Sequence, residues 1–205
     1  MLNQTDYWGN SDITVKFCEP KYQTFLWIAE YENTTSAGAY VLVGIYFLFT
    51  KLQKVGMYIL FLGISTIIMH ATLRYYGQWF DEASMLLISF EAIIKLKKNV
   101  PRYLLPIILA FYTYFSDIFI VFGCLFASFQ LIIIYLASNS INYHNPKQRI
   151  LIKTYATFFI ISAIFWFLDQ FYCDYIYDTI NGHAVWHVGT AMSMFFGFTT
   201  FLIKD

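Results

Sequence analysis

Residues 66–82 read TIIMHATLRYYGQWFDE, and this stretch decides how the chain folds. It begins inside one apolar run, carries His70 at the end of that run, turns at Gly77 and enters the next apolar run through Asp81. Ionisable side chains at the edge of a hydrocarbon-spanning segment are costly, so they are candidates for function by default. The stretch therefore predicts two apolar helices joined by a tight turn, with ionisable residues gathered near the turn.

The composition of the whole chain indicates a membrane protein. Of its 205 residues, 59% are hydrophobic and only 13% are charged, and a soluble domain of this size would need far more polar surface. The apolar residues come in blocks of roughly 15–25, the length of helix that spans a hydrocarbon core of about 30 Å. We expect an all-α, polytopic integral membrane protein.

The apolar runs number seven and lie near residues 37–50, 55–73, 80–96, 103–116, 118–138, 150–172 and 184–203. The residues before them are polar with scattered aromatic side chains, as is typical of a segment at a membrane interface. The sequence thus predicts a seven-transmembrane helix bundle over residues 37–205. An N-terminal interfacial head, residues 1–36, precedes the bundle, and the two together form a single domain.

The orientation follows from the positive-inside rule. Ten of the thirteen Lys and Arg residues lie in loops after odd-numbered runs: Lys51, Lys54, Lys95, Lys97, Lys98, Arg102, Lys147, Arg149, Lys153 and Lys204. We therefore expect these loops and the C-terminus in the cytosol, with the N-terminus lumenal or extracellular. This asymmetry also requires an odd number of spans.

The last apolar run opens with GHAVWH at residues 182–187, which places His183 and His187 on one helix face. The topology brings these two histidines to the same membrane depth as His70 and Asp81. A histidine pair alone is often only an interface pair, so the third histidine and the acid carry the metal interpretation. Three neutral imidazoles with an open fourth position describe a catalytic zinc site, whose bound water has a pKa near ~7. Asp81 is then placed to take a proton from that water and return it to a leaving group.

Three further polar residues belong to this interpretation. Thr66 is one helical turn before His70 on the same face, and its hydroxyl, or that of neighbouring Ser65, is placed to hydrogen-bond a developing oxyanion. Asp169 lies near the lumenal end of the sixth run, where two interpretations stay open. It either orients a histidine or forms a hydrogen bond between helices.

The three cysteines, Cys18, Cys124 and Cys173, are too scattered to indicate a metal cluster or a disulfide framework. We expect three ordinary thiols.

Motifs spread over almost the whole chain resemble those of the alkaline ceramidases, and in the same order: Tyr7-Trp8-Gly9, Cys18-Glu19, Ile28-Ala29-Glu30, Asn33-Thr34, His70-Ala71-Thr72-Leu73, Gln78, Asp81-Glu82, Met85 and His183-Ala184-Val185-Trp186-His187. That family is seven-helical, resides in endoplasmic reticulum, Golgi or plasma membranes, and belongs to a hydrolase superfamily that includes the adiponectin receptors. The resemblance implies zinc-dependent hydrolysis of the ceramide amide to a sphingoid base and a fatty acid.

The resemblance also implies a role for each site residue. His70, His183 and His187 would bind zinc, and Asp81 would be the proton shuttle. Thr66 stands where the family usually has a serine near the oxyanion, which keeps the hydroxyl and adds a methyl group.

The head departs from the resemblance at its calcium site, which the family builds from Asp-Trp-x-Glu-x-Asn and a later Glu. Here that stretch reads KFCEPK at residues 16–21. The remnant ligands are Phe17, Glu19 and Glu30. Calcium takes about six to eight oxygen ligands, and the ammonium groups at positions 16 and 21 offer none. We expect one of these two lysines to form a salt bridge with Glu19 or Glu30 in place of the ion; the alternative is a weakened calcium site with both lysines facing solvent.

The sequence thus predicts a zinc-dependent amide hydrolase that acts on ceramide-type lipids in the bilayer. We expect no nucleic-acid partner, and no protein partner can be inferred. The alternative is a catalytically degenerate relative that binds lipid or acts as a receptor-like membrane protein. A hydrolase must keep all three histidines and Asp81, as this chain does, whereas a pure lipid binder need not keep the acid.

Overall fold

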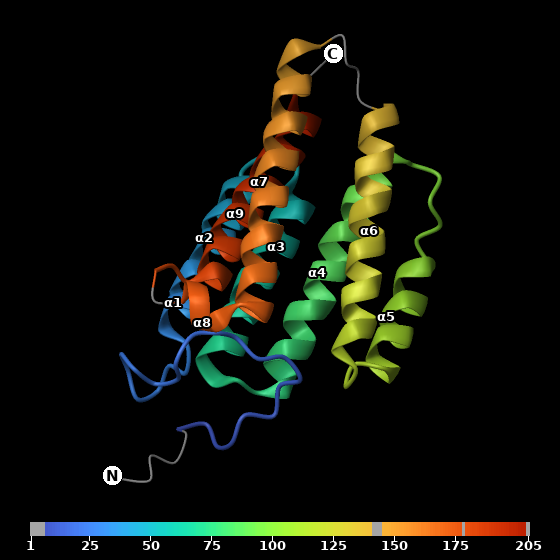
Figure 1. Cartoon of the computed structure of the whole chain (residues 1–205). Coiled ribbons are helices and arrows are strands. Elements are labelled where there is room, and N and C mark those ends of the chain that lie inside the picture. The colour runs from blue at the N-terminus through green and yellow to red at the C-terminus, as the bar shows by residue number, and fades with distance from the viewer. Residues whose placement is uncertain (1–6, 141–144, 178, 204–205) are drawn as a thin grey trace, which may run out of the picture.

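A computed structural model describes residues 7–140, 145–177 and 179–203, and the regular structure in these ranges is helical (Figure 1). The helices in chain order are α1 (Tyr31–Ser36), α2 (Gly38–Leu48), α3 (Gln53–Thr72), α4 (Tyr75–Leu96), α5 (Leu104–Tyr114), α6 (Phe119–Ser140), α7 (Pro146–Phe171), α8 (Cys173–Ile176), α9 (Gly182–Thr199) and the 3₁₀ helix η1 (Thr200–Leu202). The seven predicted apolar runs correspond to α2 to α7 and α9. The predicted all-α class is confirmed; Lys204, used above for the orientation, lies outside the described residues.

Helices α3, α6 and α7 are long and apolar enough to cross a membrane. Helices α6 and α7 also expose large hydrophobic side chains, among them Leu131, Tyr135 and Ile164. Such a surface is unfavourable in water and suits lipid. Helices α2 and α5 have 11 residues each, about 16 Å of helix, which is shorter than the ~30 Å hydrocarbon core. The chain is an all-α helical membrane protein.

The predicted turn between α3 and α4 exists but lies before Gly77. Helix α3 ends where Leu73 adopts a left-handed conformation, with φ of 51°, and the extended Arg74 then starts α4. Gly77 already lies inside α4. A Cβ atom there would be 2.8 Å from the Cα of Met69, so this glycine lets α4 pack closely against the end of α3.

The bundle has two sides (Figure 1). Helices α2 and α3 pack together, α9 packs against α2 and α7, and α4 joins α3 to α6. Helix α6 thus packs mainly against α4, whereas α7 packs mainly against α9. As a result, α6 and α7 form two facing walls of the interior.

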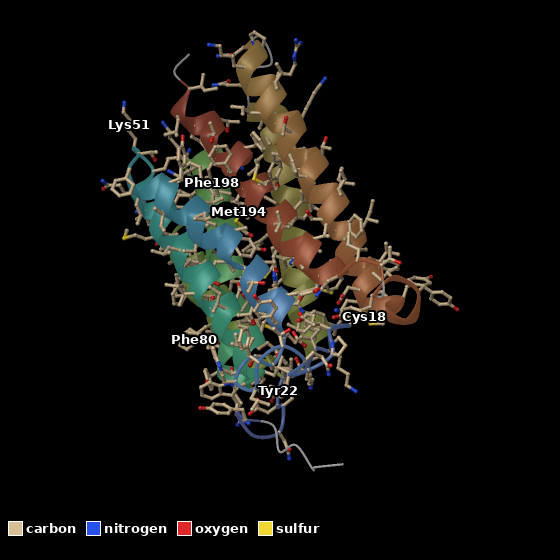
Figure 2. All side chains as sticks on the ribbon, turned by 90° about the vertical axis from the view of Figure 1, so that its left-hand side faces the viewer. Cys18, Tyr22, Lys51, Phe80, Met194 and Phe198 are labelled. Carbon is tan, nitrogen blue, oxygen red and sulfur yellow. A yellow bond between two sulfur atoms is a disulfide. The ribbon has the colours of Figure 1, made fainter. Side chains whose placement is uncertain are left out.

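The N-terminal head crosses the end of the bundle at which α3 ends and α9 begins (Figure 1). Its backbone is bonded there: the amide of Ala29 donates to the carbonyl of Ala71 at 2.9 Å, and that of Glu30 donates to the carbonyl of His70 at 3.1 Å. Figure 2 shows Lys51, one of the predicted cytosolic lysines, at the opposite end of the bundle from Cys18 and Tyr22 of the head. The head therefore covers the end of the bundle that carries the histidines.

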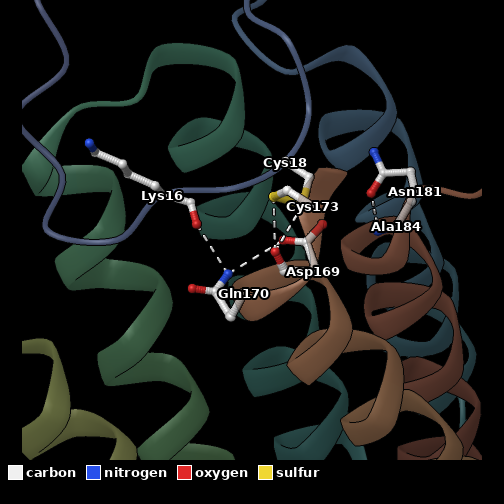
Figure 3. The surroundings of a disulfide bond; sticks show 7 residues. All are labelled: Lys16, Cys18, Asp169, Gln170, Cys173, Asn181 and Ala184. Carbon is white, nitrogen blue, oxygen red and sulfur yellow. Dashed lines mark hydrogen bonds between the residues drawn. A yellow bond between two sulfur atoms is a disulfide. The ribbon is translucent and has the colours of Figure 1, made fainter. Parts of the chain in front are cut away.

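A disulfide bond joins Cys18 of the head to Cys173 of α8 (Figure 3). The Cα atoms are 5.3 Å apart although 155 residues separate the two cysteines. Beside the bond, the amide of Gln170 donates to the carbonyl of Lys16 at 3.1 Å. The prediction of three ordinary thiols was wrong for this pair, because the bundle returns α8 to the end where the head lies. Cys124 is a free, exposed thiol, as expected.

Candidate metal centre and its cavity

Three histidines meet beneath the head. His70 comes from the last turn of α3, and His183 and His187 come from the first two turns of α9. All three are buried, with exposed fractions of 0%, 4% and 2%. One ligand nitrogen from each lies within 4.8 Å of the other two. The structure therefore brings together the three residues that the sequence predicts as metal ligands.

The imidazole of His70 is held by Glu30. Its Nδ1 lies 2.7 Å from Oε2 of Glu30, and both side chains are fully buried. A carboxylate at Nδ1 favours the tautomer whose other ring nitrogen carries a lone pair. That nitrogen, Nε2, is buried and has no hydrogen-bond partner among the described residues. A buried unpaired nitrogen is costly unless something binds it, and a metal ion would do so.

The other two histidines complete the set. Nδ1 of His187 lies 3.1 Å from the carbonyl oxygen of Asn33 and 2.9 Å from the hydroxyl of Ser36. A carbonyl only accepts, so Nδ1 carries the proton and Nε2 is left with the lone pair. Nδ1 of His183 is buried without a partner in the described part of the chain. The residues present therefore fit a metal ion, and three imidazole nitrogens are the donor set that zinc prefers.

Asp81 lines the same cavity as His183 and His187. The hydroxyl of Thr66 donates to Oδ1 of Asp81, and the same hydroxyl lies 2.8 Å from the carbonyl of Leu62. The structure thus joins Thr66 to the acid. Ser65 is directed elsewhere: its hydroxyl donates to Leu62 at 2.9 Å and lies 3.2 Å from that of Ser84.

A cavity of 410 Å³ extends from this cluster into the bundle. Its polar lining comes chiefly from the metal-centre end, and much of the rest is aromatic and aliphatic. Helix α6 contributes Phe122 and Phe126 among others, and α7 contributes Phe159 and Trp166. A cavity with polar groups at one end and apolar walls beyond suits a molecule with a polar head and a hydrocarbon chain.

Glu82 forms a buried network that the sequence analysis did not predict. Its carboxylate accepts from the amide of Gln78 at 2.7 Å and from the hydroxyl of Tyr112 at 2.8 Å. The Gln78 side chain in turn bonds the backbone and the hydroxyl of Thr14. These contacts fasten α4 to α5 and to the head. In the sequence, the only indication of this network is the position of two adjacent acids at the start of an apolar run.

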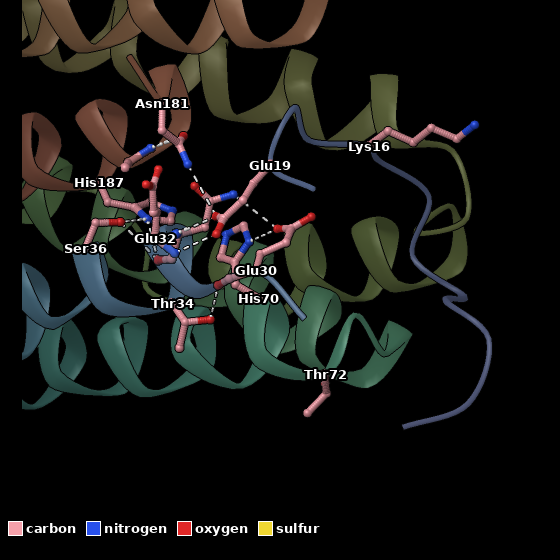
Figure 4. Close-up of polar contacts among 12 residues, drawn as sticks. Lys16, Glu19, Glu30, Glu32, Thr34, Ser36, His70, Thr72, Asn181 and His187 are labelled. Atoms are coloured by element: carbon pink, nitrogen blue, oxygen red, sulfur yellow. Dashed lines mark hydrogen bonds and ion pairs between the residues drawn. The ribbon is translucent and has the colours of Figure 1, made fainter. Parts of the chain in front are cut away.

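The acidic pair of the head is paired mainly with amides and a histidine (Figure 4). Glu19 accepts from the backbone amides of Glu32 at 2.6 Å and Asn33 at 2.8 Å, and from the side chain of Asn181, the N-cap of α9, at 3.3 Å. Glu30 bonds His70 as described above, and also accepts from the side chain of Asn33 at 3.1 Å. Burial raises the pKa of Glu19 to about 7 and that of Glu30 to about 8.

The predicted salt bridge of these acids with a lysine was wrong. The ion pairs within 4 Å in the described residues do not include Lys16 or Lys21, and Figure 4 shows Lys16 directed away from Glu19 and Glu30. The physical reason is that the amides at the start of α1 and the ring of His70 already occupy the carboxylates. The positive charge of Lys21 still affects Glu30 without direct contact, because it opposes the rise in the pKa of Glu30.

Phe17, predicted as a remnant calcium ligand, contacts the histidines through its ring. Its ring packs against His70 and His183, with ring centroids 4.7 and 4.2 Å apart.

Asp169 is buried beside the start of α9, where a Cβ on Gly182 would be 3.3 Å from the Cβ of Asp169. Because the described hydrogen bonds join it to no histidine ring, the structure favours contact between α7 and α9 over the orientation of a histidine.

The fold and the site define an integral membrane helix bundle with a buried three-histidine centre at one end of an apolar cavity. The chain belongs to the ceramidase family, since the family model described as Ceramidase matches residues 9–204.

Three relatives show the extent of the similarity. Alkaline ceramidase YPC1 of Saccharomyces cerevisiae is 23% identical, over 92% of this chain and 75% of its own length. Alkaline ceramidase of Arabidopsis thaliana is 25% identical, over 90% and 80%. Alkaline ceramidase 3 of Mus musculus is 24% identical, over 95% and 84%. The similarity to these proteins therefore covers head and bundle together.

Proposed function

We propose that this protein is a zinc-dependent amide hydrolase that cleaves ceramide-type sphingolipids into a sphingoid base and a fatty acid. The observation that carries the proposal is the histidine centre itself. Two buried ring nitrogens there, Nε2 of His70 and Nδ1 of His183, have no partner among the described residues. His183 and His187 also line a cavity with apolar walls. Membership of the ceramidase family supplies the substrate class.

His70, His183 and His187 would hold the zinc ion. Bound there, zinc would lower the pKa of a water molecule toward neutrality and polarise the amide carbonyl. Glu30 and the backbone of Asn33 keep two of the imidazoles in the orientation and tautomer that ligation needs. These contacts fix the centre before substrate enters.

Asp81 supplies the proton transfer. Hydrolysis adds a hydroxyl group to the acyl carbon and protons to the leaving nitrogen, so one group must accept a proton and give it back. Asp81 lines the same cavity as His183 and His187, and the hydroxyl of Thr66 donates to its carboxylate. For Thr66 to stabilise an oxyanion as well, its hydroxyl must change partner during the reaction.

The cavity walls support a lipid substrate that enters from the bilayer. Helices α6 and α7 both line the cavity and both expose large apolar side chains on their outer faces. The disulfide bond of the head is of the kind that persists in an oxidising compartment. It agrees with a lumenal or extracellular N-terminus and a cytosolic C-terminus.

The first experiment is the zinc content of detergent-purified protein, wild type against His187→Ala, by elemental analysis. We expect one zinc ion per chain in the wild type and a large loss in the variant. Hydrolysis of ceramides is then compared between wild type and Asp81→Asn, which keeps the size of the side chain and removes its basicity. Absence of zinc from carefully prepared wild-type protein would refute the hydrolase proposal and leave the lipid-binding alternative.

A further inference from the structure

The interior of the bundle holds a second cavity beyond the first. It has a volume of 80 Å³ and extends to Leu96 at the end of α4 and Phe201 near the C-terminus, on the side away from the histidines. The two cavities share part of their lining: Tyr40, Leu62, Met85, Phe126, Gln130, Phe159 and Trp186. We call these shared residues the neck. A hydrocarbon chain that starts at the metal centre and outgrows the first cavity meets the neck next.

Gln130 gives the neck an unpaired polar group. The residue is 91% buried, since its exposed fraction is 9%. Its Nε2 donates to the hydroxyl oxygen of Ser89 at 3.0 Å, and that hydroxyl donates its own proton to the carbonyl of Met85 at 2.7 Å. Because Ser89 can then only accept, the amide of Gln130 must present its nitrogen to Ser89. Among the residues that the structure describes, none donates to the remaining amide oxygen.

Of the other polar side chains of the neck, the indole of Trp186 can only donate, and the hydroxyl of Tyr40 is already paired. The hydroxyl of Tyr40 lies 2.5 Å from that of Thr190. The amide oxygen of Gln130 is therefore the acceptor that a chain in the neck would meet. Methylene groups cannot donate a hydrogen bond to it, and they would displace any water that does, which leaves a buried polar atom unsatisfied.

The depth of Gln130 matches the length of a lipid chain. Its partner Ser89 is eight residues after Asp81 on α4, so it lies about 12 Å deeper in the bundle. This is the reach of a medium-length alkyl chain that starts at the level of Asp81. The acyl chain is bonded directly to the carbonyl carbon that must sit at the metal centre, and it is the chain that we place in this cavity.

We propose that Gln130 sets the length of acyl chain that the protein prefers. Chains that end before the neck bury every methylene in the first cavity, whereas longer chains must pass the unpaired amide to reach the second. This inference rests on the proposed function for the identity of the chain, and on the two cavities for its mechanism.

The test uses Gln130→Met, which keeps the length of the side chain and removes its hydrogen-bonding groups. Gln130→Leu is the second variant in case the first does not fold. Ser128→Ala is the matched control, because Ser128 lies on the same helix, is exposed and lines neither cavity. The probes are saturated fatty acids of increasing length, and the readout is their dissociation constant with detergent-purified protein.

In the wild type and the control, affinity should increase roughly fourfold for each added methylene, about 0.8 kcal/mol, and then stop increasing once the chain reaches the neck. In the Gln130 variants the increase should continue over several more methylenes. The same plateau in wild type and variants would overturn the proposal, as would the absence of any plateau in the wild type.

Hydrolysis of ceramides that differ only in acyl length separates this inference from the proposed function. A shift of the plateau without hydrolysis of any ceramide refutes the proposed function and leaves the assignment of Gln130 standing. Hydrolysis with an unshifted preference for acyl length refutes the assignment of Gln130 alone.

Discussion

The bond between Glu30 and His70 predicts a graded loss of zinc. Glu30→Ala removes the acceptor that fixes the His70 tautomer, whereas Glu30→Gln keeps an acceptor and removes its charge. A hydrogen bond to a charged group contributes about 1.5–3 kcal/mol, and ~1.4 kcal/mol corresponds to a factor of ten. We therefore expect Glu30→Ala to weaken zinc binding by roughly 10–100-fold, the range typical of a residue that orients a metal ligand. Glu30→Gln should fall between Glu30→Ala and the wild type.

The assay is competition for zinc between the purified protein and a chelator of known affinity. Glu32→Gln is the matched control, because Glu32 is exposed and only two residues away. Its affinity for zinc should equal that of the wild type. The reasoning is refuted if Glu30→Ala binds zinc as tightly as Glu32→Gln does, or if Glu30→Gln is weaker than Glu30→Ala.

Four further outcomes are expected. Calcium and its chelators should leave the melting temperature unchanged, because amides and a histidine occupy the head carboxylates; a saturable stabilisation by calcium would contradict this. Cys18→Ser should lower the melting temperature by removing a cross-link, while Cys124→Ser should not, and equal effects of the two variants would count against a bond to Cys173. The pKa of Glu19 is raised from its usual 4.5 to about 7. The contribution of Glu19 to stability is therefore complete below pH ~4.5 and is lost as the pH rises through ~7. Glu19→Gln should flatten that part of the pH profile of the melting temperature. Asp81→Asn should lower ceramide turnover by roughly 10²–10⁴-fold with zinc content unchanged, and a matching loss of zinc would instead give Asp81 a structural role.

Sequence patterns predicted what depends on hydropathy and topology. Seven apolar runs became seven helices because a hydrocarbon environment leaves the backbone few alternatives. His70 was predicted to meet His183 because the run of His70 ends at the membrane depth where the run of His183 begins, and the structure brings the two together. The turn at Leu73 was displaced from the predicted position because a left-handed leucine gives no sequence signal, whereas the glycine four residues later gives a misleading one.

What the sequence could not predict depends on side chains that meet across long stretches of chain. The pairing of Cys18 with Cys173 requires the position of α8 relative to the head, and hydropathy does not determine that position. Glu30 was assigned to a calcium remnant from a motif, while its contact with His70 follows from the backbone pairing of the head with the end of α3. The lysines at positions 16 and 21 add positive charge to the head. The direct partners of the acids of the head are nevertheless amides and not these lysines.

The head is therefore part of the candidate metal centre and not an appendage to it. Phe17 packs against two histidine rings, and Glu19 joins the start of α1 to the N-cap of α9. Glu30 bonds His70, one of the two rings that Phe17 contacts, and the carbonyl of Asn33 bonds the third histidine, His187. A chain that lacked residues 1–36 would keep all three histidines and the acid. It would lose the contacts that orient the histidines, and the end of the cavity at which they lie would be uncovered. The candidate metal ligands and Asp81 lie on α3, α9 and α4, whereas the residues that bond His70 and His187 come from the head.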